Sequence, residues 1–313
     1  MKILVTGGAG FIGSNLVDKL IQLNHQVVVI DNLSTGKKEN INSNCKFYDL
    51  DIVDKNLFRV FEEENPSLVF HLAAQVDVAR SFTNPYEDAM TNILGTINIL
   101  EACRKNQVRK IIFASSAAVY GIPQYLGIDE KHITKPISFY GYSKLTSENY
   151  IQMYSNAYEL DYSILRYANV YGPRQNYNGE GGVIAIFINK ILNLEIPSIY
   201  GDGNQNRDFI YVDDVVNANI SAINKGNKVI LNVGTGRSTS INELYEIIKV
   251  SMNTKINPLY MQERKGDIKE SYFNVSLANV SLEWSNKYSL NIGIEKTISF
   301  YLRRRYTELN TRR

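Results

Sequence analysis

Residues 3–13, which read Ile-Leu-Val-Thr-Gly-Gly-Ala-Gly-Phe-Ile-Gly, decide the fold of this chain. A short apolar run leads into a turn with glycine at positions 7, 10 and 13, and the residues after it, up to Leu23, have the apolar spacing of a helix. This order of strand, glycine turn and helix is typical of a dinucleotide-binding unit, in which glycine allows the backbone to approach a diphosphate. Three glycines alone could mark tight helix packing instead, so the neighbouring sequence has to decide.

The second predicted strand, residues 27–30, ends in a carboxylate, Asp31. A carboxylate at this strand end accepts hydrogen bonds from the adenosine ribose of a dinucleotide and repels a 2′-phosphate. The sequence therefore predicts dinucleotide binding, with NAD rather than NADP as the cofactor.

Strands and helices go on alternating through the first half of the chain. Further strands are expected at 46–52, 68–71, 110–114 and 162–166, and helices near 55–64, at about 86–104 and after residue 140. Most of these strands are near-continuous apolar runs, which predicts an α/β fold with a doubly wound parallel sheet, Rossmann-like, covered on both faces.

The alternation breaks after Arg166, where Tyr, Asn, Gly and Pro accumulate. We therefore expect an NAD-binding domain over 1–166 and a smaller C-terminal α/β lobe that binds substrate over 167–313. A helix is expected near 182–194, and an apolar run at 229–233 is expected to return to the sheet as a strand.

Composition excludes several classes of function. A net charge of +2 over 313 residues does not indicate nucleic acid or a membrane as partner. The two cysteines, Cys45 and Cys103, form neither a disulfide framework nor a metal cluster, so no metal is expected. No apolar run reaches the length of a membrane span, and no signal peptide precedes the first strand. A cytoplasmic protein is expected.

Three polar side chains are predicted to converge where ligands bind in such sheets. Ser116 follows the strand at 110–114, at the carboxyl end where a nicotinamide would lie. Tyr140 and Lys144 are four residues apart, hence one turn apart on one face of a helix. A Tyr-x-x-x-Lys match alone is more often an ordinary exposed helix start, and His71, at another strand end, is interpreted as structural.

The order of motifs resembles that of one family. The chain looks like an extended short-chain dehydrogenase/reductase, and most closely like the UDP-glucose (UDP-hexose) 4-epimerase family, over nearly its whole length. The motifs that carry the resemblance lie at 6–13, 31–32, 51–52, 71–74, 115–121, 140–144, 166–174, 207–214 and 264–267.

This resemblance implies an isomerase that carries tightly bound NAD and inverts C4 of a UDP-sugar through a transient 4-keto sugar. Tyr140 would be the base, helped toward phenolate by Lys144, and Ser116 would orient the 4-hydroxyl group. The implied cofactor contacts are Gly7, Gly10, Phe11, Ile12, Gly13, Asp31, Asn32, Asp51, Ile52, Leu72, Ala73, Ala74, Asn92, Tyr140, Lys144 and Tyr167. The implied substrate contacts are Ser116, Asn169, Val183, Tyr200, Arg207, Arg264, Asp267 and Ser271.

Differences from other members of the family that the chain resembles indicate which reaction is expected. The dehydratases have an acidic pair, and the decarboxylases commonly a Glu, where this chain has Ala117 and Ala118. Alanine cannot protonate a leaving hydroxyl group, which favours epimerisation over elimination. Asn169 stands where relatives that act on uronic acids often have Thr. Where some epimerases have a Lys after the His71 segment, this chain has Val76 and Asp77, so that cofactor contact is not carried over.

The sugar C2 substituent depends on Ser271, which falls at the family's gatekeeper position. Serine is small, so both UDP-glucose/UDP-galactose and UDP-GlcNAc/UDP-GalNAc are expected as substrates, unless Tyr272 fills the space. Alternatives are an epimerase of a different sugar, a net oxidoreductase that releases NADH, and a binding protein without turnover; the third is disfavoured because Ser116, Tyr140 and Lys144 are all retained. The helices at about 86–104 and 141–158 resemble those that pair in dimers of the family, so a homodimer is expected.

Overall fold

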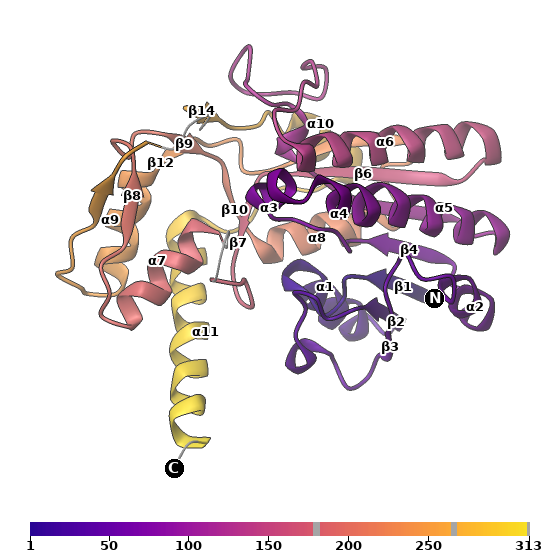
Figure 1. Cartoon of the computed structure of the whole chain (residues 1–313), viewed down its shortest axis with the longest axis horizontal. Coiled ribbons are helices and arrows are strands. Elements are labelled where there is room, and N and C mark those ends of the chain that lie inside the picture. The colour runs from indigo at the N-terminus through magenta and orange to yellow at the C-terminus, as the bar shows by residue number, and fades with distance from the viewer. Residues whose placement is uncertain (178–181, 264–267, 312–313) are drawn as a thin grey trace.

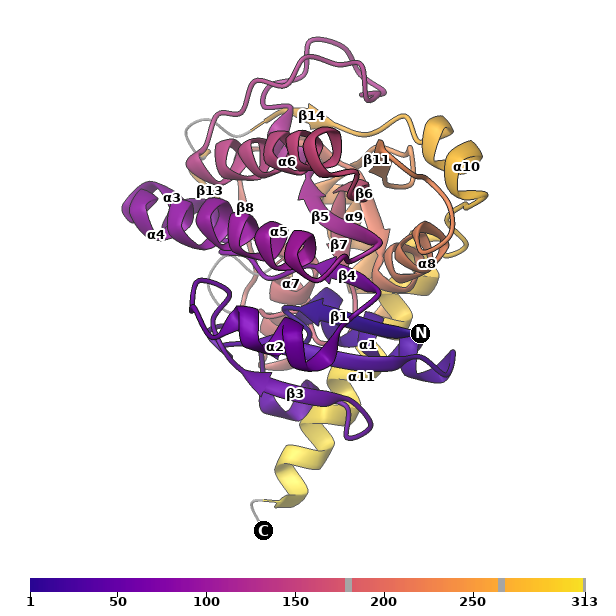
Figure 2. The same cartoon turned by 90° about the vertical axis from the view of Figure 1, so that its right-hand side faces the viewer.

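The centre of the computed structural model is a seven-stranded parallel sheet with helices on both faces (Figures 1 and 2). The structure describes residues 1–177, 182–263 and 268–311. The strand order is β11-β6-β5-β4-β1-β2-β3, which is the doubly wound arrangement predicted. The bounds are β1 (Lys2–Thr6), β2 (Gln26–Asp31), β3 (Lys46–Asp49), β4 (Leu68–His71), β5 (Lys110–Ser116), β6 (Asp161–Tyr167) and β11 (Val229–Val233).

Alternate residues of each strand supply the two halves of the core. Leu4 of β1 packs in a cluster with α2 (Leu57–Glu64), α5 (Gly95–Lys105) and α6 (Phe139–Tyr158), whereas Ile3 and Val5 pack in a cluster with α1 (Phe11–Gln22) and α8 (Val212–Ala222). Figure 2 shows these two layers on opposite sides of the sheet. Burial on both faces explains the near-continuous apolar runs of the central strands, such as β1, β2 and β4.

The sheet is not formed by residues 1–166 alone, because its edge strand beside β6 comes from the second half of the chain. The strand expected near 229–233 is β11, which runs parallel to β6 with Val229 opposite Ser163. Helix α8 precedes it and packs on α1 and β6. Two elements from the second half of the sequence therefore complete the sheet layer.

The helix expected at about 86–104 is present, but it contains a π-helical turn that was not predicted. The structure has α4 (Pro85–Ala89), a π-helical turn η2 (Met90–Leu94) and then α5. The carbonyl oxygen of Asn92 accepts hydrogen bonds from the hydroxyl groups of Thr96 and Ser147, at 2.5 and 2.8 Å. Side-chain donors thus replace part of the regular ladder and widen this turn, which sequence periodicity does not reveal. A short helix α3 (Val78–Thr83) precedes α4.

The smaller lobe, on the left of Figure 1, consists of short strand pairs and helices. Its helices are α7 (Val183–Leu192), α9 (Ile241–Ser251) and α11 (Leu290–Thr311), and its paired strands are β7 (Asn169–Tyr171) with β10 (Phe209–Tyr211), β8 (Ser198–Tyr200) with β13 (Leu259–Met261), and β9 (Asn206–Arg207) with β12 (Thr239–Ser240) and β14 (Glu270–Ser271). Helix α10 (Ser276–Leu282) packs on β11 and α8 beside the sheet. Single turns η1 (Lys38–Asn40) and η3 (Ala117–Val119) lie in the larger layer. Within the described ranges, no helix has the length and apolar character needed to span a bilayer.

Candidate active site

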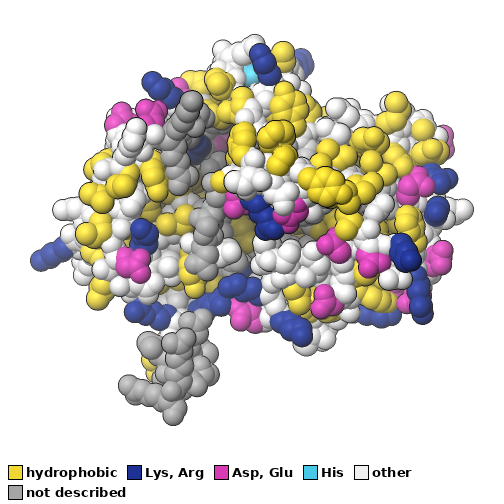
Figure 3. All heavy atoms as spheres, in the orientation of Figure 1, with side chains coloured by type: hydrophobic (Ala, Val, Ile, Leu, Met, Phe, Trp, Pro, Cys, Tyr) yellow, Lys and Arg dark blue, Asp and Glu magenta, His cyan; other side chains and the backbone are white. Residues whose placement is uncertain are grey.

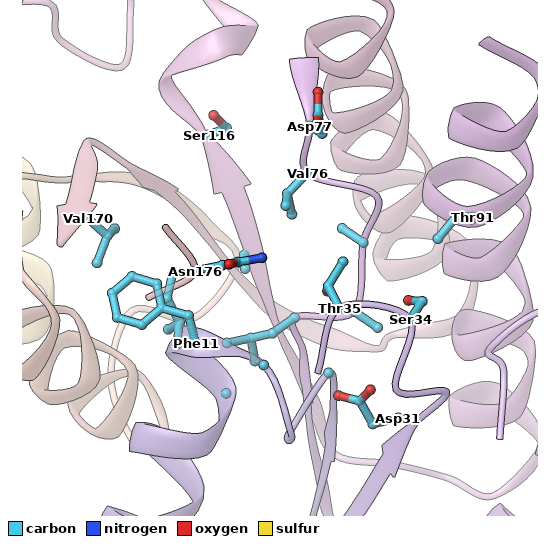
Figure 4. Close-up of a pocket in the computed structure, with 18 of the residues that line it drawn as sticks. Phe11, Asp31, Ser34, Thr35, Val76, Asp77, Thr91, Ser116, Val170 and Asn176 are labelled. Atoms are coloured by element: carbon cyan, nitrogen blue, oxygen red, sulfur yellow. The ribbon is translucent and has the colours of Figure 1, made fainter. Parts of the chain in front are cut away.

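A cavity of about 480 Å³ lies along the carboxyl ends of the sheet strands. In Figure 4, Asp31 stands at one end of it and Ser116 at the other. The predicted residues that line it are Gly7, Gly10, Phe11, Ile12, Gly13, Asp31, Asn32, Asp51, Ile52, Leu72, Ala73, Ala74, Ser116, Tyr140, Lys144 and Tyr167. The fold thus brings together residues that are spread over 160 positions of sequence, from Gly7 to Tyr167.

The glycine turn forms one wall of the cavity and fits a diphosphate. Gly7 has φ +72°, and a Cβ there would lie 2.7 Å from the backbone nitrogen of Ala73; a Cβ on Gly13 would lie 2.1 Å from the carbonyl oxygen of Gly7. Helix α1 is capped by Gly10, which has no side chain to occupy the first N–H groups, and no acidic residue lies in its first turn. Open N–H groups and the helix dipole therefore face the cavity, which suits an anion.

The carboxylate of Asp31 is fixed by the backbone. Its two oxygens accept hydrogen bonds from the N–H groups of Ala9 (2.9 Å) and Leu33 (2.8 Å). Burial raises the pKa of Asp31, and these two hydrogen bonds partly oppose the rise. Next to it, the Asn32 amide donates to Asp51 at 2.7 Å. These acceptors lie where a ribose of NAD would need them, so the residues present fit that cofactor.

Ser116, Tyr140 and Lys144 meet at the other end of the cavity. The Ser138 side chain caps α6 by accepting a hydrogen bond from the Gly141 N–H group (3.1 Å), which fixes Tyr140 in the first turn. The side chains of Tyr140 and Ser116 line the cavity together at this end. Burial raises the pKa of Tyr140, and the nearby Ser116 side chain acts in the opposite direction.

Lys144 lies beneath this pair and is 3% exposed. Its Nζ atom is 4.4 Å from the centre of the Phe113 ring. Burial lowers the pKa of Lys144 to about 8, while the carboxylates of Glu148 and Asp88 oppose the shift. The ammonium therefore keeps most of its charge at neutral pH, as it must to favour a phenolate.

A buried polar network supports the site from below. Glu148 is fully buried and accepts two hydrogen bonds from Arg166, at 2.9 and 2.5 Å, and one from the Ser115 hydroxyl at 2.5 Å. Arg166 also donates to the Tyr120 hydroxyl at 2.9 Å. The network connects α6, β5 and β6, the three elements that carry the predicted catalytic residues and Tyr167.

His71 is structural in this geometry. It is 1% exposed, and its two ring nitrogens are hydrogen-bonded to the hydroxyl groups of Thr6 (2.8 Å) and Thr96 (3.0 Å). Burial, together with the charge of Lys144, lowers the pKa of His71 to about 3. The ring is therefore neutral and holds β4 to β1 and α5.

Asn92, expected at the cofactor, does not line the cavity. Its amide oxygen accepts from the Gln75 N–H group at 2.8 Å, and its NH₂ group donates to Gln75, Asp88 and Ser143. It positions the loop after β4, and its neighbour Thr91 lies at the cavity wall instead.

The other substrate residues lie in the smaller lobe. Asn169 begins β7, Val183 begins α7 and Tyr200 ends β8, while Ser271 is paired with Arg207 between β14 and β9. None of these five is part of the described cavity wall, and Arg264 and Asp267 lie outside the described residues. Val76 and Asp77, for which no cofactor contact was carried over, also line the cavity, as do several residues that were not predicted, namely Ser34, Thr35, Lys37, Thr91, Val170, Arg174, Gln175 and Asn176. For the segments 34–37 and 174–176, which follow β2 and β7, the position after a strand end was the available signal.

The described residues contain no candidate metal site. No group of three or more His, Cys, Asp or Glu side chains there could hold a metal ion.

Comparisons with known proteins agree with this geometry. The model of the NAD dependent epimerase/dehydratase family matches residues 3–234. UDP-glucose 4-epimerase from Thermotoga maritima, solved with UDP-glucose, is 45% identical with a TM-score of 0.96, covering 97% of this chain and 99% of that one. UDP-N-acetylglucosamine 4-epimerase from Methanobrevibacter ruminantium M1 is 38% identical with a TM-score of 0.93, covering 97% and 98%. UDP-glucuronate 4-epimerase from Thermodesulfobacterium geofontis is 33% identical over 95% of each chain.

Proposed function

Because the chain belongs to the NAD-dependent epimerase/dehydratase family, we propose that it interconverts UDP-glucose and UDP-galactose by inversion at C4, with a role in galactose metabolism. It is an isomerase of the UDP-sugar 4-epimerase group and uses NAD. The observation that carries the proposal is the meeting of Ser116, Tyr140 and Lys144 at one end of a cavity whose other end fits NAD.

The roles follow from the chemistry of these side chains. Tyr140 removes the proton of the sugar 4-hydroxyl group, Lys144 stabilises the phenolate that this requires, and Ser116 orients the hydroxyl group through a hydrogen bond. NAD supplies the hydride acceptor and donor at C4. The 4-keto sugar then turns over in the site, so that the hydride would return to the opposite face of C4, and Tyr140 returns the proton to the O4 atom. The absence of an acid at Ala117 and Ala118, in turn η3, supports epimerisation over elimination.

UDP-GlcNAc and UDP-GalNAc are also proposed as substrates. Ser271 is small and half-buried, and it lies beside Arg207 on the neighbouring strand. The Tyr272 ring comes within contact distance of Gly127, where a Cβ would be 3.8 Å from its Cε2 atom, so this ring packs toward that loop. The similarity to a UDP-N-acetylglucosamine 4-epimerase at 38% identity supports the wider range.

The nucleotide half of the substrate is assigned to the smaller lobe. We propose that Arg207 binds the diphosphate, that Tyr200 lies against the uracil, and that Asn169 and Val183 contact the sugar nucleotide. Arg264 and Asp267, proposed for the diphosphate and the uridine ribose, lie outside the described residues.

One experiment tests the proposal directly. Purified protein is incubated without added cofactor with UDP-glucose, and separately with UDP-GlcNAc, and the anomeric proton signals are followed by NMR. We expect both sugars to be interconverted with their 4-epimers by NAD that stays bound. Release of NADH in proportion to substrate would identify a net oxidoreductase instead, and inversion of only some other UDP-sugar would identify an epimerase of different specificity.

A homodimer belongs to the proposal. Apolar side chains gather over α3 to α6 on the face seen in Figure 3, and those of Phe82, Tyr86, Phe139, Tyr150 and Met153 are exposed. Patches of this kind mark interfaces more often than free surface. We expect twice the monomer mass in solution, and a shift toward monomer on Met153→Glu; a monomer at micromolar concentration would contradict the assignment.

A cytoplasmic location is also proposed. Both cysteines, Cys45 and Cys103, are free thiols in the structure, which is typical of proteins in a reducing compartment. Cell fractionation tests this point.

A further inference from the structure

Asp77 places a carboxylate on the cavity wall near the catalytic pair. It lies in the loop between β4 and α3, is half-buried, and lines the same cavity as Ser116 and Tyr140. Figure 4 shows Asp77 and its neighbour Val76 toward the Ser116 end, away from Asp31. This is the end at which the sugar ring has to lie if Tyr140 acts on its 4-hydroxyl group.

The carboxylate is held in place but retains hydrogen-bonding capacity. Its Oδ1 atom caps α3 by accepting from the Arg80 N–H group at 2.7 Å, and its own N–H group donates to the Gln75 side chain at 2.6 Å. Among the residues that the structure describes, none donates a hydrogen bond to Oδ2. A sugar hydroxyl group could fill that place.

The neighbouring charged side chains do not neutralise the negative charge of Asp77. The Arg80 guanidinium is paired with Glu87 on the outer surface, with an Nε to Oε2 distance of 3.2 Å. Behind the loop, the buried carboxylate of Asp88 accepts a hydrogen bond from Gln75 at 2.9 Å. Among the cations of the cavity wall, Lys144 is almost fully buried and Arg174 is paired with Asp18 of α1. No ion pair of the described residues neutralises Asp77, so its carboxylate is a negative charge that a sugar at this end meets.

We propose that Asp77 determines the substrate class, admitting neutral UDP-hexoses and excluding UDP-hexuronates. The inference rests on the proposed 4-epimerase function. Because the 4-keto sugar has to turn over between loss and return of the C4 hydride, its C6 group occupies two places in the site. A hydroxymethyl group can donate a hydrogen bond to Oδ2, whereas a C6 carboxylate brings a like charge against the wall.

The test is competition by UDP-glucuronate in UDP-glucose epimerisation by the holoenzyme. Asp77→Asn removes the charge and keeps the cap, since Asn caps helices as well as Asp. We expect the inhibition constant of UDP-glucuronate to fall about tenfold at about 0.02 M salt, and less at about 0.5 M salt, where the field is screened. The inhibition constant of UDP-xylose, which has no C6 group, should change less than about twofold in Asp77→Asn, because this sugar brings no negative charge near residue 77.

Asp161→Asn is the matched control. The Asp161 carboxylate also accepts backbone N–H bonds, from Tyr162 at 2.8 Å, but it lies at the amino end of β6, opposite the site. This variant should bind UDP-glucuronate as the wild type does. If the inhibition constant of UDP-glucuronate is unchanged in Asp77→Asn while UDP-glucose is still epimerised, the proposed role of Asp77 is overturned and the proposed 4-epimerase function is not. Wild-type protein that does not epimerise UDP-glucose overturns the proposed function, and this inference with it.

Discussion

At the scale of single residues, burial sets the charges on which the chemistry depends. Lys144 is held with a pKa of about 8, which is above neutral pH, so its ammonium group stays mostly charged. In the proposed mechanism this charge favours the phenolate of Tyr140. His71, one layer below, is held neutral by the same burial. Burial thus leaves Lys144 mostly charged and His71 neutral at neutral pH.

Replacing Tyr140 by Phe should remove activity while leaving the cofactor in place. The phenol is the proposed proton carrier, and its loss should lower the epimerisation rate by about 10²- to 10⁴-fold. NMR measures the rate, and the absorbance of the supernatant after denaturation measures bound NAD. Tyr142→Phe, on the exposed side of the same helix turn, is the control and should keep its rate. Equal rates in the two variants would remove Tyr140 from the mechanism.

His71 should make the folded state sensitive to acid. Its folded pKa is about 3, below the ordinary value of about 6.5, so below pH 6.5 the unfolded chain takes up a proton that the folded chain does not. The free energy of unfolding should therefore fall by about 1–2 kcal/mol between about pH 6.5 and about pH 5 through this group. Denaturant titrations of wild type and His71→Gln check this: the variant should have the flatter pH dependence, and identical slopes would contradict it.

At the scale of elements, helix α6 organises the site. Tyr140, Lys144 and Glu148 follow one another at intervals of one turn, so one face of the helix carries the proposed base, the proposed cation beside it and the buried carboxylate that pairs with β6. Glu148 is buried and paired with Arg166 of β6. The helix is thereby fixed against the strands in rotation as well as in distance.

Breaking this pair should cost far more than breaking an exposed one. Glu148→Gln leaves the Arg166 charge buried without a full partner, and we expect a loss of about 3–5 kcal/mol in the free energy of unfolding. Glu63→Gln, which breaks the exposed pair with Arg59 within α2, is the control and should change stability little. Thermal unfolding measures both, and a similar small effect in both variants would show that the network is not needed for stability.

At the scale of the whole molecule, the site depends on both parts of the chain. The sheet supplies the cofactor end and the catalytic group, while segment 174–176 reaches the cavity from the second half. Arg174 is paired with Asp18 of α1 at 2.6 Å, which joins that segment to the sheet layer. Strands β9 and β14, which carry Arg207 and Ser271, are separated by more than sixty residues of sequence and are paired in the fold.

Enlarging Ser271 should narrow the range of substrates. In Ser271→Tyr, the ring would occupy the space proposed for the N-acetyl group, so UDP-GlcNAc epimerisation should fall by about 10- to 100-fold while UDP-glucose is affected much less. Ser276→Tyr, at an exposed position shortly after it, is the control. Parallel loss of both activities, or of neither, would show that Ser271 is not the gatekeeper.

The sequence by itself determined what depends on local spacing. The glycine turn, Asp31 at a strand end and the interval from Tyr140 to Lys144 each lie within one βαβ unit or one helix turn, so the sheet, NAD and the catalytic group could be predicted. Only the tertiary structure decided what depends on contacts between distant segments. The Ser147 hydroxyl group of α6 donates to the Asn92 carbonyl oxygen in the π-turn, the Asn92 amide oxygen accepts from the Gln75 N–H group, and the β4–α3 loop brings Asp77 to the wall near Ser116. Such contacts join residues far apart in sequence, and no local period records them.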